Sequence, residues 1–199
     1  MTLVLASASP RRQELLRSAG IQFVAQPANI TEIRLPSESP KEFAEHMARE
    51  KARAIWDDAE SAHPLQKAQK GGATIVLGAD TIVVVQDEVL GKPRDGDDAA
   101  RMLKLLSGRQ HSVITGVCLL SDGFEDVRSE TTAVHFSELS EAEIRSYVAS
   151  GEPMEKAGAY AIQGLASRWI SKIEGDYNNV VGLSVDLLLR MLREHGVAG

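Results

Sequence analysis

Two arginines stand side by side at the start of an expected helix, where a helix rarely places positive charge. In the stretch LASASPRRQELL, Ser9 suits the N-cap of this helix and Pro10 its first position. Arg11 and Arg12 therefore fall in the first turn, where free N–H groups and the helix dipole already present positive charge. Together with the hydroxyls of Ser7 and Ser9, these groups would bind a phosphate. The alternative is an ordinary capped helix whose arginines are solvated.

Two carboxylates are candidates for acid–base chemistry or for a metal site. Asp80 follows an apolar run in the sequence GAD, so its carboxylate would lie between apolar strands. Burying a carboxylate there is costly unless it meets a metal, a cation or a reacting water, although many aspartates at strand ends only cap turns. Glu32, in the sequence NITEIRLP, falls in an expected loop, where it either takes part in a site or is solvated.

Two lysines and one amide complete the set of candidate residues. Lys51 falls near the apolar side of an expected long helix, where its stem can pack while its amine extends to water. Lys92 lies in a turn stiffened by Pro93 and is either a site lysine or a surface lysine. In the glycine-bounded loop GAYAIQG, Gln163 could read the hydrogen-bonding edge of a planar ligand, whereas Tyr160 could equally pack in the interior.

Taken together, these residue types suit a nucleotide. Two arginines, two lysines and a helix N-terminus suit a polyphosphate, the carboxylates suit a divalent metal and a water, and an amide-bearing loop suits a base. The formal net charge of the 199-residue chain is −6, so an anionic ligand has to be met by a local cluster of cations. The same net charge argues against wide binding to nucleic acid.

Several common catalytic motifs are absent from the sequence. There is no Walker A loop, because proline follows Lys92, and neither GxGxxG nor GxSxG occurs. The five histidines never occur at metal-ligand spacing, and a single cysteine, Cys118, excludes an intrachain disulfide and a cysteine-based zinc site. No apolar run approaches the ~18 residues of a membrane span. We therefore expect a cytoplasmic protein with no membrane partner, whose catalysis uses carboxylates, lysines and arginines.

Strand and helix patterns alternate along the chain. The patterns predict strands at 2–6, 21–25, 110–120, 127–136 and 168–173, and a strand pair in which 74–85 turns at 86–88 into 89–95. They also predict helices that start after Ser9, Ser39 and Ser140 and helices at 97–106 and 184–195. The stretches 63–72 and 152–166 are expected to be loops. This alternation predicts an α/β fold with a mixed sheet, because 110–136 has the pattern of a hairpin.

The order of these motifs resembles that of the Maf proteins, a family of nucleoside triphosphate pyrophosphatases. The resemblance rests on the segments LASASPRRQELL, AREKA, VLGADTIVVVQDEVLGKPRD, LSGRQHSVITGV, KAGAYAIQG and NNVVGL. It implies a single Maf-like domain over 1–199, with an elongated mixed sheet flanked by helices and two lobes around a cleft, as in the inosine triphosphatases. It also implies dependence on Mg²⁺ or Mn²⁺, a nucleoside triphosphate substrate and a homodimer.

The resemblance further implies catalytic roles for five residues. Asp80 falls on the position of the proton acceptor in the family. Glu32 falls on an acidic position of the cleft, and we expect it to hold the metal together with Asp80. Arg12, Lys51 and Lys92 fall on basic positions that stabilise charge on the phosphates.

Substrate binding and specificity are implied for a second set of residues, which comprises Ser7, Ser9, Arg11, Thr81 and Gln163. Substrate choice in the family follows the residues at three of these positions. The combination of Arg11, Thr81 and Gln163 is similar to that of the branch that hydrolyses dTTP and UTP between the α- and β-phosphates. We therefore expect these two nucleotides as substrates.

Three alternatives remain open at the level of sequence. The same chemistry could act on another nucleotide, such as 7-methyl-GTP or a modified pyrimidine triphosphate. A regulator of cell division could bind a triphosphate without hydrolysing it, and such a protein would not need both Asp80 and a metal. A nucleic-acid-binding module fits poorly, because the net charge is −6 and no basic strip with interleaved aromatic residues is present.

Overall fold

The chain forms two compact units, each built from separate segments of the sequence. The computed structural model describes residues 2–60 and 74–197, so the expected loop at 63–72 lies outside the described residues. The first unit comprises Met1–Asp80, Thr115–Glu130 and Gly182–Gly199, and the second comprises Thr81–Ile114 and Thr131–Val181. Neither unit is continuous in sequence, because three strands run from one into the other along the chain.

A mixed sheet of seven strands has the order β2-β1-β3-β5-β6-β7, with β4 paired to β3. The strands are β1 (Thr2–Leu5), β2 (Val24–Ala25), β3 (Thr74–Val85), β4 (Glu88–Leu90), β5 (Gln110–Ser121), β6 (Phe124–Phe136) and β7 (Ile170–Glu174). Strand β1 is parallel to β2 and to β3, whereas β4 is antiparallel to β3 and β7 is antiparallel to β6. The predicted α/β fold with a mixed sheet is therefore confirmed.

Three of the helices begin directly after the serines that the sequence predicts as their caps, which are Ser9, Ser39 and Ser140. They are α1 (Pro10–Ser18), α2 (Pro40–Glu60), α4 (Gly96–Leu106), α5 (Glu141–Ala149), α6 (Tyr177–Val181) and α7 (Val185–Glu194), with short 3-10 turns η1 (Ala157–Ala159) and η2 (Leu165–Trp169). At the start of α2, Ser39 Oγ accepts from the N–H of Glu42, and the carboxylate of Glu42 accepts from the N–H of Ser39. This reciprocal capping box was predicted from the sequence. In the parts of the chain that the structure describes, no helix combines the length and the apolar character needed to cross a membrane.

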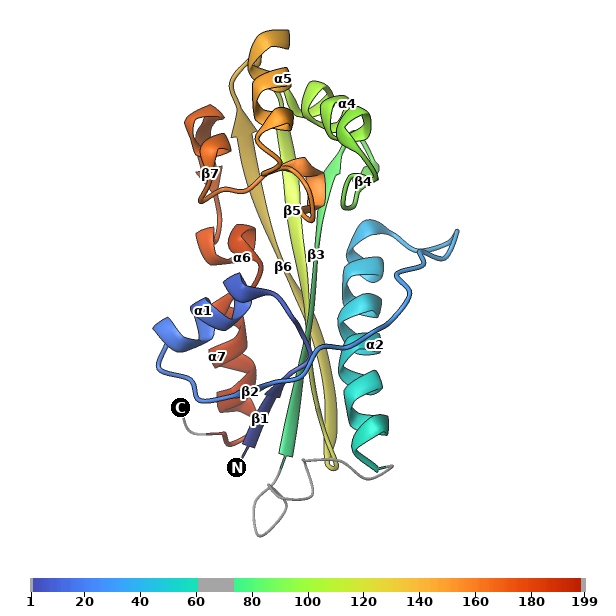
Figure 1. Ribbon diagram of the computed structural model, residues 1–199. Coiled ribbons are helices and arrows are strands. Elements are labelled where there is room, and N and C mark those ends of the chain that lie inside the picture. Colours follow the sequence, from blue (N-terminus) through green and yellow to red (C-terminus); the bar gives the residue numbers. More distant parts are fainter. Residues whose placement is uncertain (1, 61–73, 198–199) are drawn as a thin grey trace. The chain divides into compact units, whose positions relative to one another are not determined.

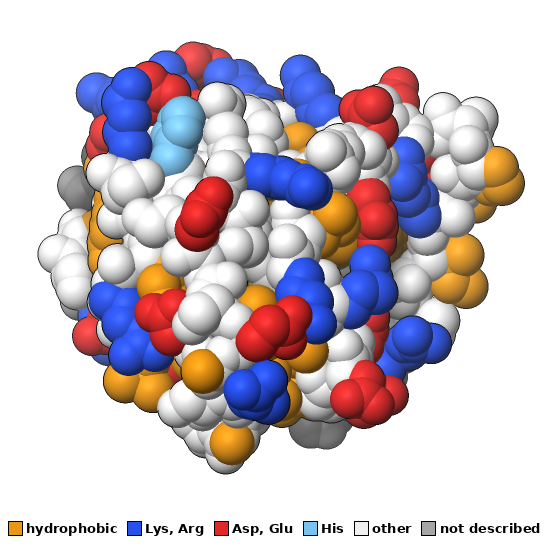
Figure 2. Space-filling view, turned by 90° about the horizontal axis from the view of Figure 1, so that it is seen from above, with side chains coloured by type: hydrophobic (Ala, Val, Ile, Leu, Met, Phe, Trp, Pro, Cys, Tyr) orange, Lys and Arg blue, Asp and Glu red, His pale blue; other side chains and the backbone are white. Residues whose placement is uncertain are grey.

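The surface carries charges of both signs. Figure 2 shows basic and acidic side chains interspersed over one face of the molecule, with hydrophobic side chains in small separate areas. Some of the surface charges pair directly, as Lys104 does with Glu141 at 2.8 Å. Mixed charge of this kind gives the face in Figure 2 no continuous positive field for a long polyanion.

In the first unit, helices cover both faces of the strands. Successive residues of a strand point to opposite faces, so Leu5 and Val4 of β1 belong to different clusters. Leu5 packs with Leu16 of α1 and Leu188 of α7, whereas Val4 packs with Ala52 of α2. Figure 1 accordingly shows α2 on one side of these strands and α1 and α7 on the other.

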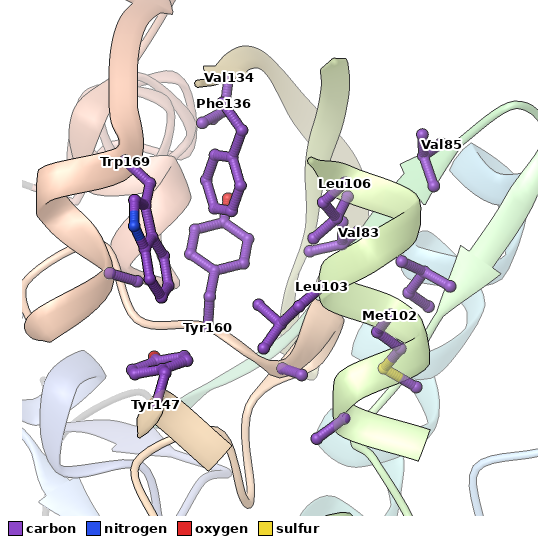
Figure 3. Close-up of a cluster of buried hydrophobic side chains, with 14 of the residues drawn as sticks. Val83, Val85, Met102, Leu103, Leu106, Val134, Phe136, Tyr147, Tyr160 and Trp169 are labelled. Carbon is purple, nitrogen blue, oxygen red and sulfur yellow. The ribbon is translucent and has the colours of Figure 1, made fainter. Parts of the chain in front are cut away.

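The second unit has its own hydrophobic core. Val83 of β3 and Phe136 of β6 pack there with Leu103 of α4 and Tyr147 of α5. Figure 3 shows that the aromatic rings of this core lie close to one another. The rings of Tyr147 and Trp169 meet edge to face, with centroids 5.1 Å apart. This geometry is favourable for aromatic pairs and holds both rings in fixed positions.

Two expected strands differ from those observed, and one observed helix was not expected. The predicted strand at 21–25 contains only Val24–Ala25, because the N–H of Ile21 donates to the carbonyl of Leu16 and closes the end of α1. The strand expected at 168–173 begins at Ile170, after the 3-10 turn η2. Helix α6 was not predicted, because five residues are too few to produce a helical repeat of apolar positions.

Candidate active site

Helix α2 lies directly on the backbone of two strands. A Cβ atom added at Gly78 of β3 would lie 2.0 Å from the carbonyl oxygen of Ala48, and one added at Gly116 of β5 would lie 2.1 Å from that of Ala44. Both distances are far shorter than any van der Waals contact, so only glycine permits this approach. Ala44 and Ala48 lie one turn apart on α2 and are fully buried. The glycine of the GAD sequence is therefore required by packing.

The close approach of α2 places Lys51 beside two carboxylates. Its Nζ lies 2.5 Å from Oδ1 of Asp80 on β3 and 2.8 Å from Oε1 of Glu32, in the loop between β2 and α2. The side chains of Lys51 and Asp80 are only 12% and 9% exposed, whereas that of Glu32 is 44% exposed. The amine of Lys51 is thus directed at the two carboxylates, and the alternative in which it extends into water is wrong.

Burial controls the proton affinity of Asp80. Removal of the carboxylate from water raises its pKa, and the positive charges of Lys51 and Arg12 offset this effect only in part. The neighbouring negative charge of Glu32 raises the pKa further. Asp80 is therefore a stronger base than an exposed aspartate, and it stands next to two cations. Perturbed carboxylates with specific charged partners are typical of catalytic sites.

Arg12 is buried and is held by two acceptors. Its Nε donates to the carbonyl oxygen of Gly182 at 2.8 Å, and its Nη1 donates to Oγ of Ser7 at 3.2 Å. Burial lowers the pKa of Arg12, and the negative charge of Asp80 counteracts this effect. Because two of its donors are fixed in this way, the guanidinium has a defined orientation in the first unit.

The start of α1 differs in charge from the starts of four other helices. Helices α2, α4, α5 and α7 carry acidic residues in their first turns, whereas α1 carries Arg11 and Arg12 and no acid. Ser9 caps α1 as predicted, since its Oγ accepts from the N–H of Arg12 at 3.4 Å. Acidic side chains usually complement the positive end of the helix dipole. The start of α1 is therefore suited to an anion that comes from outside the chain.

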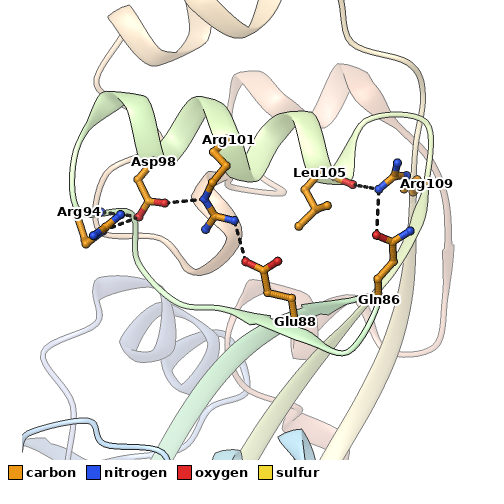
Figure 4. Close-up of polar contacts among 7 residues, drawn as sticks. All are labelled: Gln86, Glu88, Arg94, Asp98, Arg101, Leu105 and Arg109. Carbon is orange, nitrogen blue, oxygen red and sulfur yellow. Dashed lines mark hydrogen bonds and ion pairs between the residues drawn. The ribbon is translucent and has the colours of Figure 1, made fainter.

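Lys92 belongs to the second unit, where its turn between β4 and α4 is held from two directions. The carboxylate of Asp98 accepts from the N–H of Arg94 at 3.2 Å and from its Nε at 3.3 Å, and Figure 4 shows this carboxylate among its arginine partners. The carbonyl oxygen of Gly91 accepts from the N–H of Gly158 at 3.0 Å. The side chain of Lys92 itself is 56% exposed. The backbone of the turn is thus fixed, while the lysine remains accessible.

The two specificity candidates in the second unit lie in different settings. Thr81 follows Asp80 directly in β3 and is half-buried. Gln163 is exposed and lies between η1 and η2, in the stretch that was expected to be a loop. Among the hydrogen bonds that the described residues form, none involves the amide of Gln163. Its side chain is therefore accessible to a ligand.

Five of the predicted site residues come together in the first unit. They are Ser7, Arg12, Glu32, Lys51 and Asp80, contributed by four separate stretches of the chain. Thr81, Lys92 and Gln163 belong to the second unit.

Sequence reasoning did not assign a role to Gly182, whose carbonyl holds Arg12. The residue lies in the quoted segment NNVVGL, but a backbone acceptor leaves no side-chain signal. Its φ of 140° is a conformation that other residues rarely adopt, and this is the physical reason for a glycine there.

Comparison with known families identifies the family of this chain. The sequence model of the Maf-like protein family matches residues 2–195. The chain belongs to the Maf family. The match runs through both units and includes the residues of the Lys51–Asp80–Glu32 cluster and the turn that carries Lys92.

Three relatives align with this Maf protein over almost their full lengths, and each is named dTTP/UTP pyrophosphatase. The protein of Koribacter versatilis is 51% identical over 99% of this chain and 96% of its own. The protein of Symbiobacterium thermophilum is 50% identical over 98% of this chain and 94% of its own. That of Syntrophomonas wolfei is 47% identical over 96% of this chain and 96% of its own.

Proposed function

We propose that this Maf protein hydrolyses dTTP and UTP to the nucleoside monophosphate and pyrophosphate. The names of the relatives aligned above support this substrate class. The observation that carries the proposal is the convergence of Arg12, Lys51, Asp80 and Glu32 within the first unit. Two cations suited to phosphates there stand beside two carboxylates suited to a metal and a water.

Asp80 acts as the proton acceptor for the attacking water. Its raised pKa brings its basicity closer to the pH at which the enzyme operates, which improves general-base catalysis. Lys51 lies within hydrogen-bonding distance of Asp80 and keeps the carboxylate oriented. The base is then positioned before the substrate arrives.

Arg12 and Lys51 stabilise the negative charge that develops on the phosphates and on the leaving pyrophosphate. Ser7 and Gly182 fix the guanidinium of Arg12, so that little reorganisation is needed during the reaction. Ser9 and the positive end of the helix dipole at the start of α1 bind phosphate oxygens. Lys92 provides a further positive charge for the phosphates. This role rests on its position in the family motif.

The two carboxylates fit a divalent cation that is also held by the substrate. Glu32 and Asp80 offer hard oxygen donors, which Mg²⁺ and Mn²⁺ prefer. Within residues 2–60 and 74–197, no group of three or more His, Cys, Asp or Glu side chains is arranged to hold a metal. Mg²⁺ usually binds through one or two carboxylates together with substrate phosphates. When bound, such a cation neutralises phosphate charge and orients water.

Arg11, Thr81 and Gln163 select the base. This assignment rests on their positions in the family motifs and on the exposed side chain of Gln163. An amide both donates and accepts hydrogen bonds, which matches the carbonyl and N–H groups on the edges of thymine and uracil.

A panel of canonical and modified triphosphates, assayed with Mg²⁺ and with Mn²⁺, tests the proposal. We expect monophosphate and pyrophosphate in equal amounts, with dTTP and UTP as the preferred substrates. Release of inorganic phosphate, or a preference for 7-methyl-GTP, would contradict the assigned reaction or the assigned substrate. Binding without turnover under both metals would indicate a nucleotide-binding regulator instead.

A further inference from the structure

The loop that carries Gln163 is fixed by two polar side chains that no motif assigned. The carboxylate of Glu152 accepts from the N–H of Leu165, at 2.9 Å to Oε1 and 3.1 Å to Oε2. The hydroxyl of Tyr147 accepts from the N–H of Ala161 at 3.3 Å. These two anchored N–H groups lie two residues before and two residues after Gln163.

The two anchoring side chains are joined to each other. The hydroxyl of Tyr147 donates to Oε1 of Glu152 at 2.9 Å, so one connected network holds both ends of the loop. The loop also approaches the carboxylate closely, because a Cβ atom added at Gly164 would lie 2.0 Å from Oε1 of Glu152. A larger residue next to Gln163 would therefore displace the carboxylate of Glu152 from this contact.

Tyr147 connects the network to the rigid core of the second unit. The residue is 1% exposed, and its ring packs edge to face on Trp169 in the cluster of Figure 3. It lies on α5, whose start is held by the capping box of Ser140 and Glu143. A second contact joins Trp169 to α5, since Nε1 of Trp169 donates to Oε1 of Glu143 at 3.2 Å. The hydroxyl of Tyr147 therefore has a fixed position.

We propose that Tyr147 and Glu152 are positioning residues that place the amide of Gln163 and thereby set the base selectivity of the enzyme. This inference rests on the proposed function, in which Gln163 reads the base. The amide is exposed and takes part in no hydrogen bond among the described residues, so the backbone of its loop sets the region that the amide can reach. A shift of the loop moves the amide relative to the base and leaves Arg12, Lys51 and Asp80 unchanged.

The test compares kcat/KM for dTTP and GTP in Tyr147→Phe, Glu152→Gln and Glu152→Ala. We expect the dTTP/GTP ratio to fall about five- to tenfold in Glu152→Ala. Glu152→Gln should give an intermediate ratio, because one acceptor oxygen remains. Tyr177→Phe is the matched control, since this tyrosine of the same unit is exposed and outside the network, and its ratio should equal that of the wild type. Thermal unfolding of each variant shows whether it is folded at the assay temperature.

A double-mutant cycle with Gln163→Ala separates positioning from a general structural role. If Glu152 acts through Gln163, Glu152→Ala should change the nucleotide ratio little in the Gln163→Ala background. An unchanged ratio in Glu152→Ala, or equal effects of that substitution in both backgrounds, would overturn the proposal.

Amide hydrogen exchange at 161–165 gives a readout that does not depend on activity. Exchange there should accelerate in Glu152→Ala and remain unchanged in Tyr177→Phe, and unaltered exchange in Glu152→Ala would refute the anchoring. A wild-type enzyme that does not hydrolyse dTTP would contradict the proposed function and with it the role in selectivity. The exchange rates would still decide whether Glu152 anchors the loop.

Discussion

At the scale of single residues, the site depends on charges of opposite sign that lie next to one another. Lys51 is bound to Asp80 and Glu32, and Arg12 lies close enough to change the pKa of Asp80. Removing one member of a buried pair leaves its partner without compensation, whereas removing both members often costs less. The sequence predicted every member of this group, but it did not reveal which of them touch.

A double-mutant cycle on Lys51 and Asp80 tests this coupling. Lys51→Met should lower the free energy of unfolding by about 2–3 kcal/mol, and adding Asp80→Asn should restore part of that loss. Urea unfolding of the wild type, both single variants and the double variant gives the coupling energy, which we expect to exceed about 1 kcal/mol. Lys41→Met, on the exposed face of the same helix, is the control and should change stability by less than about 0.5 kcal/mol. Additive single effects would show that the two groups do not stabilise each other.

His111 gives a pH dependence that is independent of the site. The residue is 2% exposed, and its Nε2 is hydrogen-bonded to the hydroxyl of Tyr160 at 2.9 Å. Burial lowers the pKa of His111 from 6.5 to about 4. Between pH 6.5 and pH 4, His111 is therefore protonated in the unfolded chain and neutral in the folded chain. The contribution of His111 to the free energy of unfolding is therefore present above pH 6.5 and is lost as the pH falls. We expect a loss of about 2 kcal/mol between pH 7 and pH 5. His111→Gln should lose correspondingly less stability over this range, and identical pH profiles for the two proteins would contradict the assignment.

At the scale of elements, caps and turns were predictable, whereas the close approach of α2 to the sheet was not. The box of Ser39 and Glu42 follows from residues three apart in sequence, so local spacing was sufficient. The contact of Gly78 with Ala48 joins residues thirty positions apart, and no local pattern records it. The same limit applies to the anchored loop around Gln163, because Glu152 is an ordinary polar residue until the fold brings Leu165 to it.

Gly78→Ala tests how far the site depends on that close approach. The added methyl group would meet the carbonyl of Ala48 at 2.0 Å, so α2 must move outward and carry Lys51 away from Asp80. We expect a loss of about 1–3 kcal/mol in stability and a fall of about 100-fold in kcat/KM, measured by urea unfolding and by pyrophosphate release. Gly123→Ala is the matched control, because a Cβ atom there meets nothing within 4 Å. A Gly78→Ala enzyme with wild-type activity would mean that the helix position is unimportant for catalysis.

At the scale of the whole molecule, a net charge of −6 coexists with a local group of cations. The surface in Figure 2 is of mixed sign, so binding to anions has to come from specific sites rather than from a general field. Composition alone predicted this separation, and the buried Arg12 and the half-buried Lys51 agree with it. The division into two units was not apparent from composition, because three of the four boundaries between them fall inside continuous strands.

Thermal unfolding separates specific from general anion binding. A non-hydrolysable dTTP analogue with Mg²⁺, at about 100 times its Kd, should stabilise the folded state by about 2.7 kcal/mol. That corresponds to an increase in Tm of about 5–10 °C for a chain of this size. A short oligonucleotide at low salt should leave the Tm unchanged. A large shift with the oligonucleotide and none with the analogue would favour a nucleic-acid-binding protein.

The central claim is that the buried carboxylate of Asp80 accepts a proton while neighbouring cations hold the triphosphate. Its most direct test is the rate of pyrophosphate release from dTTP by Asp80→Asn, measured together with the Kd of the non-hydrolysable analogue. We predict a fall of at least about 1,000-fold in kcat with a Kd within about tenfold of that of the wild type, because Arg12 and Lys51 remain. Turnover by Asp80→Asn at close to the wild-type rate would contradict the account.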